Sequence, residues 1–523
     1  MYFEVKKQKL ALVLALIAIF AFSACAWAAP ARGGIFRFAV IDEAPTLDQQ
    51  RITADLGTMI AQHIFEGLYT FNSRYEPVPM LVEGEEILED GRVVLLTLRE
   101  GVKFHNGRIM DAEDVLASLN RWGQFGIRGP VLFNNIETIE AVGTHQIKIT
   151  FTQPFAPWKN LLAFLNGGPV IIPREIAEAA GEDFLTSDQY IGTGPYKFVE
   201  RSIGRYIRLV RFDEYSSRTE PADGYFGERV AYFDELRFIP VPDAMTRVSG
   251  VRAGDFDFAE QIPGDLYDSL YEDPSVRIVV GQGASQIFVF FNSAEGIFKD
   301  NFELRQAILA AVDMEAAQHA TFGPRDLWSM SGSFLPSTTP WYSQAGVERY
   351  SQGNPELARQ LAEAAGYNGE TIVFLASSSF QVHFDFSTVI VQQLRDAGFN
   401  VDFQTFDWAT KLSRRSDPQQ WDLFLTAHGF IPDPSLFTFM SETFPGWWRT
   451  ETREALAREF SETIDPAQRV EVWGRIQALI YEEIPVMKSG FHYTYYIHAP
   501  NLEGIAESAL IWPRFWGVGF RDE

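Results

Sequence analysis

The chain has 523 residues, of which 46% are hydrophobic and 22% charged, and its formal net charge at pH 7 is −25. That length exceeds what one hydrophobic core supports, so we expect more than one domain. The acidity excludes nucleic acid and anionic membrane surfaces as expected partners. The single cysteine excludes a disulfide framework and a cysteine-based metal site.

Residues 1–28 have the pattern of a secretory signal peptide. Lys6, Lys7 and Lys9 precede an apolar run over residues 10–22, and Ala26-Trp27-Ala28 supplies a small-residue cleavage site. The apolar run is too short to span a membrane. Segment 22–25, Phe-Ser-Ala-Cys, weakly resembles a lipoprotein box, so lipid attachment at Cys25 is the alternative. Without residues 1–28, which carry three lysines and one glutamate, the formal charge falls from −25 to −27.

The first half of the mature chain mixes strands and helices. Alternating apolar residues predict strands, and apolar residues three and four positions apart predict helices. In chain order we expect a strand at 34–40, a helix at 56–68, a strand at 93–98, helices at 112–122, a strand at 146–151, a helix at 158–165, and strands at 206–210, 235–239 and 287–291.

Beyond residue 350, helices and strands alternate. We expect helices at 356–365 and 388–397 and strands at 371–375, 401–406 and 422–427. This alternation predicts an open α/β sheet.

Residues 95–122 contain the most specific pattern. A strand at 95–99 precedes the hairpin dipeptide Asn106-Gly107, and Asp111 stands at an N-cap position with Asp114 three residues on. The string LRxGVKFHNGxxxxAEDV in this segment closely resembles the signature block of the family 5 extracellular solute-binding proteins, the peptide- and nickel-binding receptors of ABC importers.

Other segments resemble the same family in the same order. They are GTGPYKF at 192–198, Phe291-Asn292 followed by LRQAI at 304–308, and LARQLAEAAGY at 357–367. On their order and spacing, the chain is identified as a member of this family.

The resemblance implies the fold. It implies an α/β protein of two lobes around a cleft, joined by a hinge of crossing strands, with an additional subdomain in the first lobe. We expect residues 29–74, 191–286 and 495–523 to form lobe I, residues 75–190 the extra subdomain, and residues 287–494 lobe II. The expected crossings are residues 287–291 and a segment near 487–496.

Catalytic and metal-binding motifs are absent from the sequence. There is no G-x-S-x-G, H-E-x-x-H or phosphate-binding loop, and none of the eight histidines is paired at helical spacing. His105 lies inside the signature block, where a structural role is favoured over metal binding. We therefore expect no enzyme activity, no cofactor and no metal, which disfavours the nickel-binding branch.

Ligand contacts are expected at residues 421–434, where a strand ends in a Gly/Pro turn containing His428, Phe430 and Asp433. In the peptide receptors that this region resembles, an Asp just before the final Asp-Pro holds the peptide amine. This chain has Phe430 or Ile431 there instead. That departure weakens a free-peptide assignment and leaves room for sugars, opine-like conjugates or blocked peptides.

Aromatic and basic residues add candidate contacts. Trp408 follows a strand, and Trp447 and Trp448 lie in a Pro/Gly loop, where an aromatic face can meet a sugar ring or an apolar side chain. Arg415 can clamp a carboxylate. Packing in the core is the alternative for each Trp, and surface exposure is the alternative for Arg415.

Taken together, we expect a periplasmic, monomeric receptor that captures an oligopeptide or dipeptide and delivers it to an ABC permease of the inner membrane. A carbohydrate or opine-like sugar conjugate is the alternative ligand. A secreted glycan hydrolase is a remote alternative, because no facing carboxylate pair can be assigned from sequence. A folding helper for exported proteins is a third class.

Overall fold

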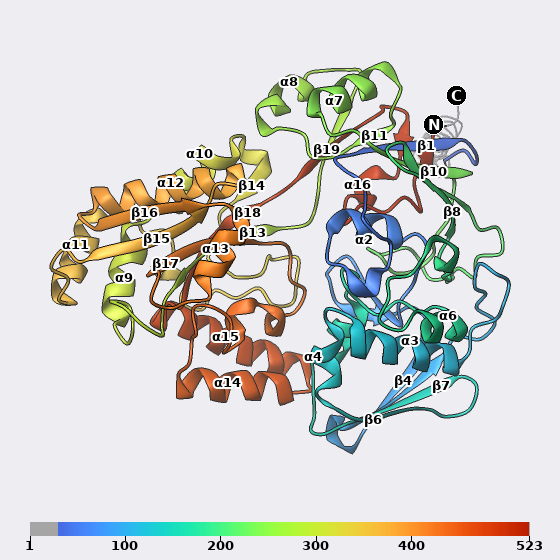
Figure 1. Ribbon diagram of the computed structural model, residues 1–523, viewed down its shortest axis with the longest axis horizontal. Coiled ribbons are helices and arrows are strands. Elements are labelled where there is room, and N and C mark those ends of the chain that lie inside the picture. Colours follow the sequence, from blue (N-terminus) through green and yellow to red (C-terminus); the bar gives the residue numbers. More distant parts are fainter. Residues whose placement is uncertain (1–29, 522–523) are drawn as a thin grey trace, which may run out of the picture.

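The computed structural model describes residues 30–521. The expected signal peptide and Cys25 lie outside the described residues. Figure 1 shows a two-lobed α/β molecule, with one lobe on the left, the second at the upper right, and a smaller sheet with its helices below the second lobe.

Lobe I is built on a seven-stranded mixed sheet of order β12-β19-β11-β1-β10-β9-β8, in which β1 is parallel to β10 and β11. Its strands are β1 (Ile35–Val40), β8 (Tyr196–Ser202), β9 (Tyr206–Arg211), β10 (Glu235–Pro240), β11 (Phe258–Ala259), β12 (Arg277–Val280) and β19 (Tyr495–His498). Its helices are α2 (Asp55–Ala61), α7 (Ala244–Ala253), α8 (Tyr267–Tyr271) and α16 (Ile505–Ser508). Two short pairs, β2 (Tyr69–Phe71) with β3 (Pro77–Pro79) and β20 (Leu502–Glu503) with β21 (Gly519–Phe520), flank it.

The subdomain is a four-stranded antiparallel sheet of order β4-β5-β7-β6. Its strands are β4 (Val82–Leu88), β5 (Val93–Leu98), β6 (Ile136–Ala141) and β7 (Gln146–Phe151), and its helices are α3 (Ala112–Phe125), α4 (Gly129–Phe133), α5 (Trp158–Ala163) and α6 (Arg174–Ala180). Helix α3 begins at a capping box in which the side chains of Asp111 and Asp114 each accept a hydrogen bond from the other residue's backbone.

Lobe II is built on a six-stranded mixed sheet of order β14-β18-β13-β17-β15-β16. Its strands are β13 (Ser285–Phe291), β14 (Trp328–Ser329), β15 (Thr371–Ser377), β16 (Asn400–Phe406), β17 (Leu423–His428) and β18 (Val486–His492). Its helices are α9 (Phe302–Ala311), α10 (Met314–Phe322), α11 (Pro355–Ala364), α12 (Gln381–Asp396), α13 (Trp408–Arg415), α14 (Glu451–Glu462) and α15 (Pro466–Glu483). The parallel strands β15, β16 and β17 carry the expected open α/β pattern.

The buried apolar residues form one contiguous cluster through both lobes and the subdomain, from Phe36 in β1 through Trp122 in α3 to Phe374 in β15. A smaller cluster packs beneath α7 and α8. Strand β13 is buried along nearly its whole length because it lies between β17 and β18, which explains its unbroken apolar sequence.

The chain passes between the lobes twice. It leaves the first sheet after β12 and enters the second at β13, and it returns from β18 to β19. The first crossing is therefore residues 281–284, just before the expected 287–291, and the second is residues 493–494, inside the expected segment. The two crossings touch, because the backbone N–H of Gly281 donates to the carbonyl of Thr494 at 2.8 Å. The exact lobe boundaries stay a prediction.

Two helices differ from expectation. The helix expected at 56–68 is α2 and ends at Ala61, because the chain then turns so that buried His63 bonds both Ile60 and the distant Phe515. The helix expected at 388–397 is α12, which begins at Gln381. Its N-cap residue, Phe380, makes no side-chain capping bond, so no local start signal precedes it.

Candidate functional site

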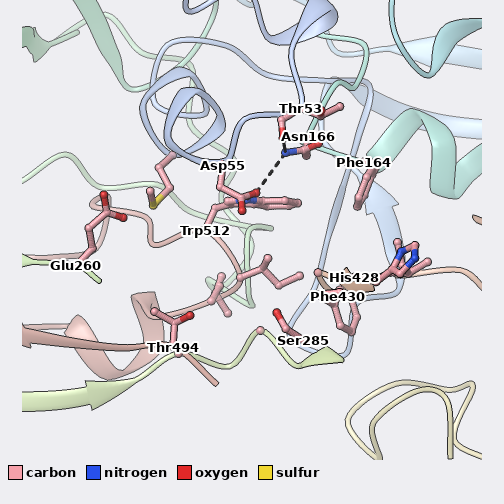
Figure 2. Close-up of a pocket in the computed structure, with 18 of the residues that line it drawn as sticks. Thr53, Asp55, Phe164, Asn166, Glu260, Ser285, His428, Phe430, Thr494 and Trp512 are labelled. Carbon is pink, nitrogen blue, oxygen red and sulfur yellow. Dashed lines mark hydrogen bonds between the residues drawn. The ribbon is translucent and has the colours of Figure 1, made fainter. Parts of the chain in front are cut away.

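A cavity of about 380 Å³ lies where the lobes, the subdomain and both crossings meet. Its walls come from residues Thr53, Asp55 and Met59 of lobe I, Arg128, Phe164 and Asn166 of the subdomain, Glu260 and Gln261 after β11, Gly281, Gly283, Ser285, Thr494 and Tyr496 around the crossings, Ala427, His428, Gly429, Phe430 and Ile431 of lobe II, and Leu510, Ile511 and Trp512 near the C-terminus. Figure 2 shows ten of these residues labelled around the cavity.

Asp55, the first residue of α2, presents its carboxylate to the cavity. Its Oδ1 accepts hydrogen bonds from the indole Nε1 of Trp512 at 2.8 Å and from Asn166 Nδ2 at 3.4 Å. Partial burial at the cavity raises the pKa of Asp55, an effect that the Trp512 hydrogen bond partly offsets.

Glu260 directly follows β11 and is only 3% exposed. Its Oε1 accepts the backbone N–H of Ile41 at 2.9 Å. Burial raises the pKa of Glu260 to about 7, against the effects of that hydrogen bond and of the Arg247 charge, and the negative charge of Asp55 adds to the rise. Arg247 is no ion-pair partner, because its guanidinium donates to backbone carbonyls, including that of Glu260 itself.

Arg128 supplies a positive charge from the subdomain, at the N-cap of α4. Its Nε donates to the carbonyl of Asn166 at 2.8 Å, and the guanidinium lies over the ring of Phe164, 4.6 Å from the centroid. Burial lowers the pKa of Arg128 to about 10, so it remains a cation at neutral pH.

Two of the residues expected from sequence, His428 and Phe430, line the cavity. Burial lowers the pKa of His428 to about 4, so its ring is neutral, and Nε2 lies 3.1 Å from the hydroxyl of Thr438. The ring of Phe430 lies 4.3 Å from that of Tyr75, which precedes β3.

Asp433 and Trp448 do not reach the cavity. Both oxygens of Asp433, which is fully buried, pair with Arg469 at 2.6 and 3.0 Å. The indole of Trp448 is buried and donates to the carboxylate of Glu483. These expected contacts are therefore placed inside the packing of lobe II, where the protein already satisfies their polar groups.

Trp408, Arg415 and Trp447 also lie outside the cavity wall. The ring of Trp408 packs edge-on against Phe380, and that of Trp447 stacks on Trp421 at 5.7 Å. The guanidinium of Arg415 lies over aromatic rings, the nearer centroid being 4.9 Å away. Of the seven expected residues, only His428 and Phe430 line this cavity.

Sequence reasoning missed Asp55, Glu260 and Arg128. One signal pointed to Glu260, since it follows a short strand, and the carboxyl ends of strands in open α/β sheets are where ligands bind. Asp55 and Arg128 carry no local signal, because only the folded chain brings a helix start and a subdomain loop to one cavity.

His105 has structural contacts in the fold. Its Nε2 lies 2.9 Å from the carbonyl of Gly194, and its Nδ1 accepts the N–H of Gly192 at 3.3 Å. Within residues 30–521, no group of three or more His, Cys, Asp or Glu side chains is arranged to hold a metal ion. In the same part of the chain, every helix is too short or too polar to cross a bilayer.

Comparison with known proteins identifies the family. Residues 76–447 match the model of the bacterial extracellular solute-binding proteins, family 5. A probable peptide ABC transporter periplasmic-binding protein, y4tO of Sinorhizobium fredii, is 27% identical over 91% of this chain and 92% of its own length.

Solved structures agree on the fold. The periplasmic binding protein DppA of Helicobacter pylori, in complex with the peptide STSA, superposes with a TM-score of 0.75 at 20% identity, covering 94% of this chain and 99% of that one. AgaA of A. tumefaciens R10, in complex with agropinic acid, gives 0.73 at 22% identity with the same coverage. Since the family model spans well over half of the sequence, this chain belongs to the family 5 bacterial extracellular solute-binding proteins.

Proposed function

We propose that this protein is the substrate-binding component of an ABC importer and that it captures a small peptide-type solute in the cavity between its lobes. The observation that carries the proposal is the composition of the cavity wall, which draws on both lobes, the subdomain and both crossings. A ligand there touches parts of the chain that move relative to one another when the lobes open.

Capture then follows from differential affinity. A ligand that contacts both walls binds the closed arrangement more tightly than an open one, so it shifts the population towards closure. The closed form would be the one that docks on the permease of the inner membrane. Receptor activity of this kind needs no catalytic group, and we propose that the chain has no enzyme activity.

A peptide is the favoured ligand class because the relative from Sinorhizobium fredii is named as a probable peptide receptor and DppA was solved with a peptide. An opine-like conjugate is the second candidate, because AgaA was solved with agropinic acid and Phe430 or Ile431 occupies the position where the peptide receptors that this region resembles have a carboxylate.

We further propose that the protein acts as a monomer in the periplasm after cleavage behind Ala28. Lipid attachment at Cys25 is the alternative. The intact mass of protein purified from membrane and soluble fractions separates the two, because cleavage behind Ala28 leaves no cysteine to carry a lipid.

The first test is native mass spectrometry of protein isolated from its own periplasm, followed by thermal-shift titration with the ligand released on denaturation. Saturation at 100 times the Kd should stabilise the folded form by about 2.7 kcal/mol. A co-purified mass that fragments into amino acids supports a peptide receptor. One that fragments into hexose or an opine-like conjugate supports the second candidate, and turnover of a glycan would contradict the receptor proposal.

Two tryptophan variants form a matched pair for the site. Trp512→Ala removes a cavity wall and the indole donor to Asp55, so the ligand affinity should fall at least ~10-fold. Trp408→Ala removes a ring outside the cavity and should leave the affinity within about twofold. Equal losses in both variants would contradict the assignment of this cavity as the ligand site.

A further inference from the structure

The cavity contains charges that the protein itself does not neutralise. Within residues 30–521, neither Asp55 nor Glu260 has a Lys, Arg or His nitrogen within 4.0 Å, and Arg128 has no carboxylate oxygen within that distance. Fully buried carboxylates elsewhere are paired, as in Asp48–Arg121 at 2.6 Å and Glu66–Arg229 at 3.1 Å. Asp55 and Glu260 thus lack the protein counter-ion that these buried carboxylates have.

Both carboxylates also retain free acceptor capacity. An ionised carboxylate offers about four lone-pair sites. In the part of the chain that the structure describes, Asp55 uses only Oδ1, and Glu260, although 3% exposed, accepts a single bond at Oε1. Asp55 Oδ2 and Glu260 Oε2 are left for a donor that enters the cavity.

The two signs of charge lie at different ends. In Figure 2, Glu260 is at one side of the cavity, Asp55 is between, and Phe164 is at the other side. Arg128 lies on Phe164, which puts the cation at the end away from Glu260. The indole of Trp512 lies between the two ends (Figure 2).

From this arrangement we propose that the cavity selects a small zwitterion, whose ammonium group binds between Asp55 and Glu260 and whose anionic group binds Arg128. The inference rests on the proposed function and names the ligand chemistry of that cavity. A volume of about 380 Å³ is near the lower end of the range of roughly 300–1,000 Å³ for small-molecule sites, so the ligand is a short peptide or amino-acid conjugate rather than a long peptide.

In this arrangement the amine of the ligand binds the lobe I wall of the cavity and not the lobe II turn. Residues 430 and 431 offer no carboxylate, and Asp433 is occupied by Arg469 and by Asn160, whose Nδ2 donates to it at 2.8 Å. Asp55 and Glu260 of lobe I supply the carboxylates that the lobe II turn lacks. The departure at Phe430 therefore does not exclude a free amine.

Binding to an ammonium should depend on pH in a defined direction. Glu260 must be ionised to pair with a cation, so the affinity is highest above its free-state pKa of about 7 and falls as the pH is lowered through it. The charged or titratable groups that act on Glu260 are Asp55 from α2, Arg247 from α7 and Tyr496 from β19. Burial lowers the pKa of Arg247 and raises that of Tyr496.

The test uses isothermal titration of the full mature protein with free dipeptides (Ala-Ala, Ala-Leu and Gly-Phe), their N-acetyl forms and their C-terminal amides. Removing the ammonium or the carboxylate should each weaken binding ~10–100-fold, as expected for charge-assisted hydrogen bonds. Glu260→Gln and Asp55→Asn should weaken the free dipeptides ~10-fold or more and change the N-acetyl forms by less than about twofold. Arg128→Gln should weaken the free dipeptides by a similar factor and leave the affinity for the C-terminal amides nearly unchanged.

Asp255→Asn, an exposed carboxylate in the same lobe, is the matched control and should change nothing. Glu260→Gln keeps the acceptor for Ile41, and an unchanged melting temperature verifies its fold. The loss of affinity between pH 8 and 6 should disappear in this variant. Equal affinities for free and N-acetylated peptides would overturn the zwitterion proposal. Binding of neutral sugars with an affinity that none of the three variants changes would overturn it as well. Either result would leave the receptor function standing. Binding of no organic solute at all would instead contradict the proposed function.

Discussion

At the scale of single residues, Asp433 shows how a carboxylate in a motif typical of ligand binding can serve the fold. Its two oxygens accept a bidentate pair from Arg469, and Ser435 and Asn160 complete its hydrogen bonds. Both partners of the ion pair are almost completely buried. Removing one partner would strand the other as an uncompensated buried charge.

Arg469→Met should therefore lower the free energy of unfolding by about 3–5 kcal/mol, measured by urea denaturation. Arg475→Met, on the same helix, breaks the half-exposed pair with Glu459 and should cost under about 1 kcal/mol. If the two variants are equally stable, the Asp433 pair is not a stabilising contact.

The same scale shows the limits of sequence reasoning about the site. A motif search selects Asp433 because of its neighbours in sequence, and it overlooks Asp55 because nothing adjacent to that residue indicates a cavity. Whether a carboxylate faces a ligand or an arginine depends on residues outside its local sequence: Arg469 is 36 positions from Asp433, and Trp512 is 457 positions from Asp55. His428 and Phe430 can be predicted because His428 ends a recognisable strand, β17, and Phe430 follows it by two residues.

At the scale of elements, helix α5 links the subdomain to lobe II. Asn160 on this helix donates to Asp433, and the backbone N–H of Ala156, just before the helix, donates to the carbonyl of Ser461 at 2.8 Å. With the crossings, these contacts hold the two lobes together at two separate places.

Removing one of these contacts should favour opening. Asn160→Ala deletes the side-chain bond to Asp433 without touching the cavity wall, so the ligand-free protein should shift towards an open form with a larger radius of gyration in solution X-ray scattering. Asn134→Ala, exposed on the same subdomain, is the control and should leave the scattering unchanged. An identical curve for Asn160→Ala would mean that the link does not hold the lobes closed.

Elements with their own end signals could be predicted from sequence. Helix α3 has a capping box and the expected start, and β5, β7, β9, β10 and β16 lie within a residue of the expected ranges. Helix α2 ends early because His63 is held by Phe515, a contact that no local window contains. Helix α12 begins without a side-chain cap, so no sequence signal marks its first turn.

At the scale of the whole molecule, buried histidines make stability depend on pH. Burial lowers the pKa of His63 and His492 to about 3, that of His105, His383 and His428 to about 4, and also that of His498. These groups are neutral in the folded state and take up protons only on unfolding, so the stability they contribute is complete above about pH 6.5 and lost as pH falls towards 4. Asp257 and Glu260, with pKa values raised to about 6 and 7, act in the opposite direction, as do Asp55 and Asp422, whose pKa values burial also raises. These four carboxylates are fewer than the six histidines.

The free energy of unfolding should accordingly fall between pH 7 and pH 5, as measured by urea denaturation. His105→Asn should flatten this dependence, and His319→Asn, at an exposed position, should leave it unchanged. Greater stability at pH 5 than at pH 7 would show that the raised carboxylates outweigh the histidines.

The position of β19 in the first sheet has a consequence for the order in which the chain can fold. Strand β19 lies between β11 and β12 and is antiparallel to both, although it comes from residues 495–498. During synthesis, β11 can pair only with β1, and β12 has no partner in this sheet, until almost the entire polypeptide has been made. Lobe I, whose first strand is made at the start, is among the last parts that can be finished, and the nascent chain stays incompletely folded throughout its elongation.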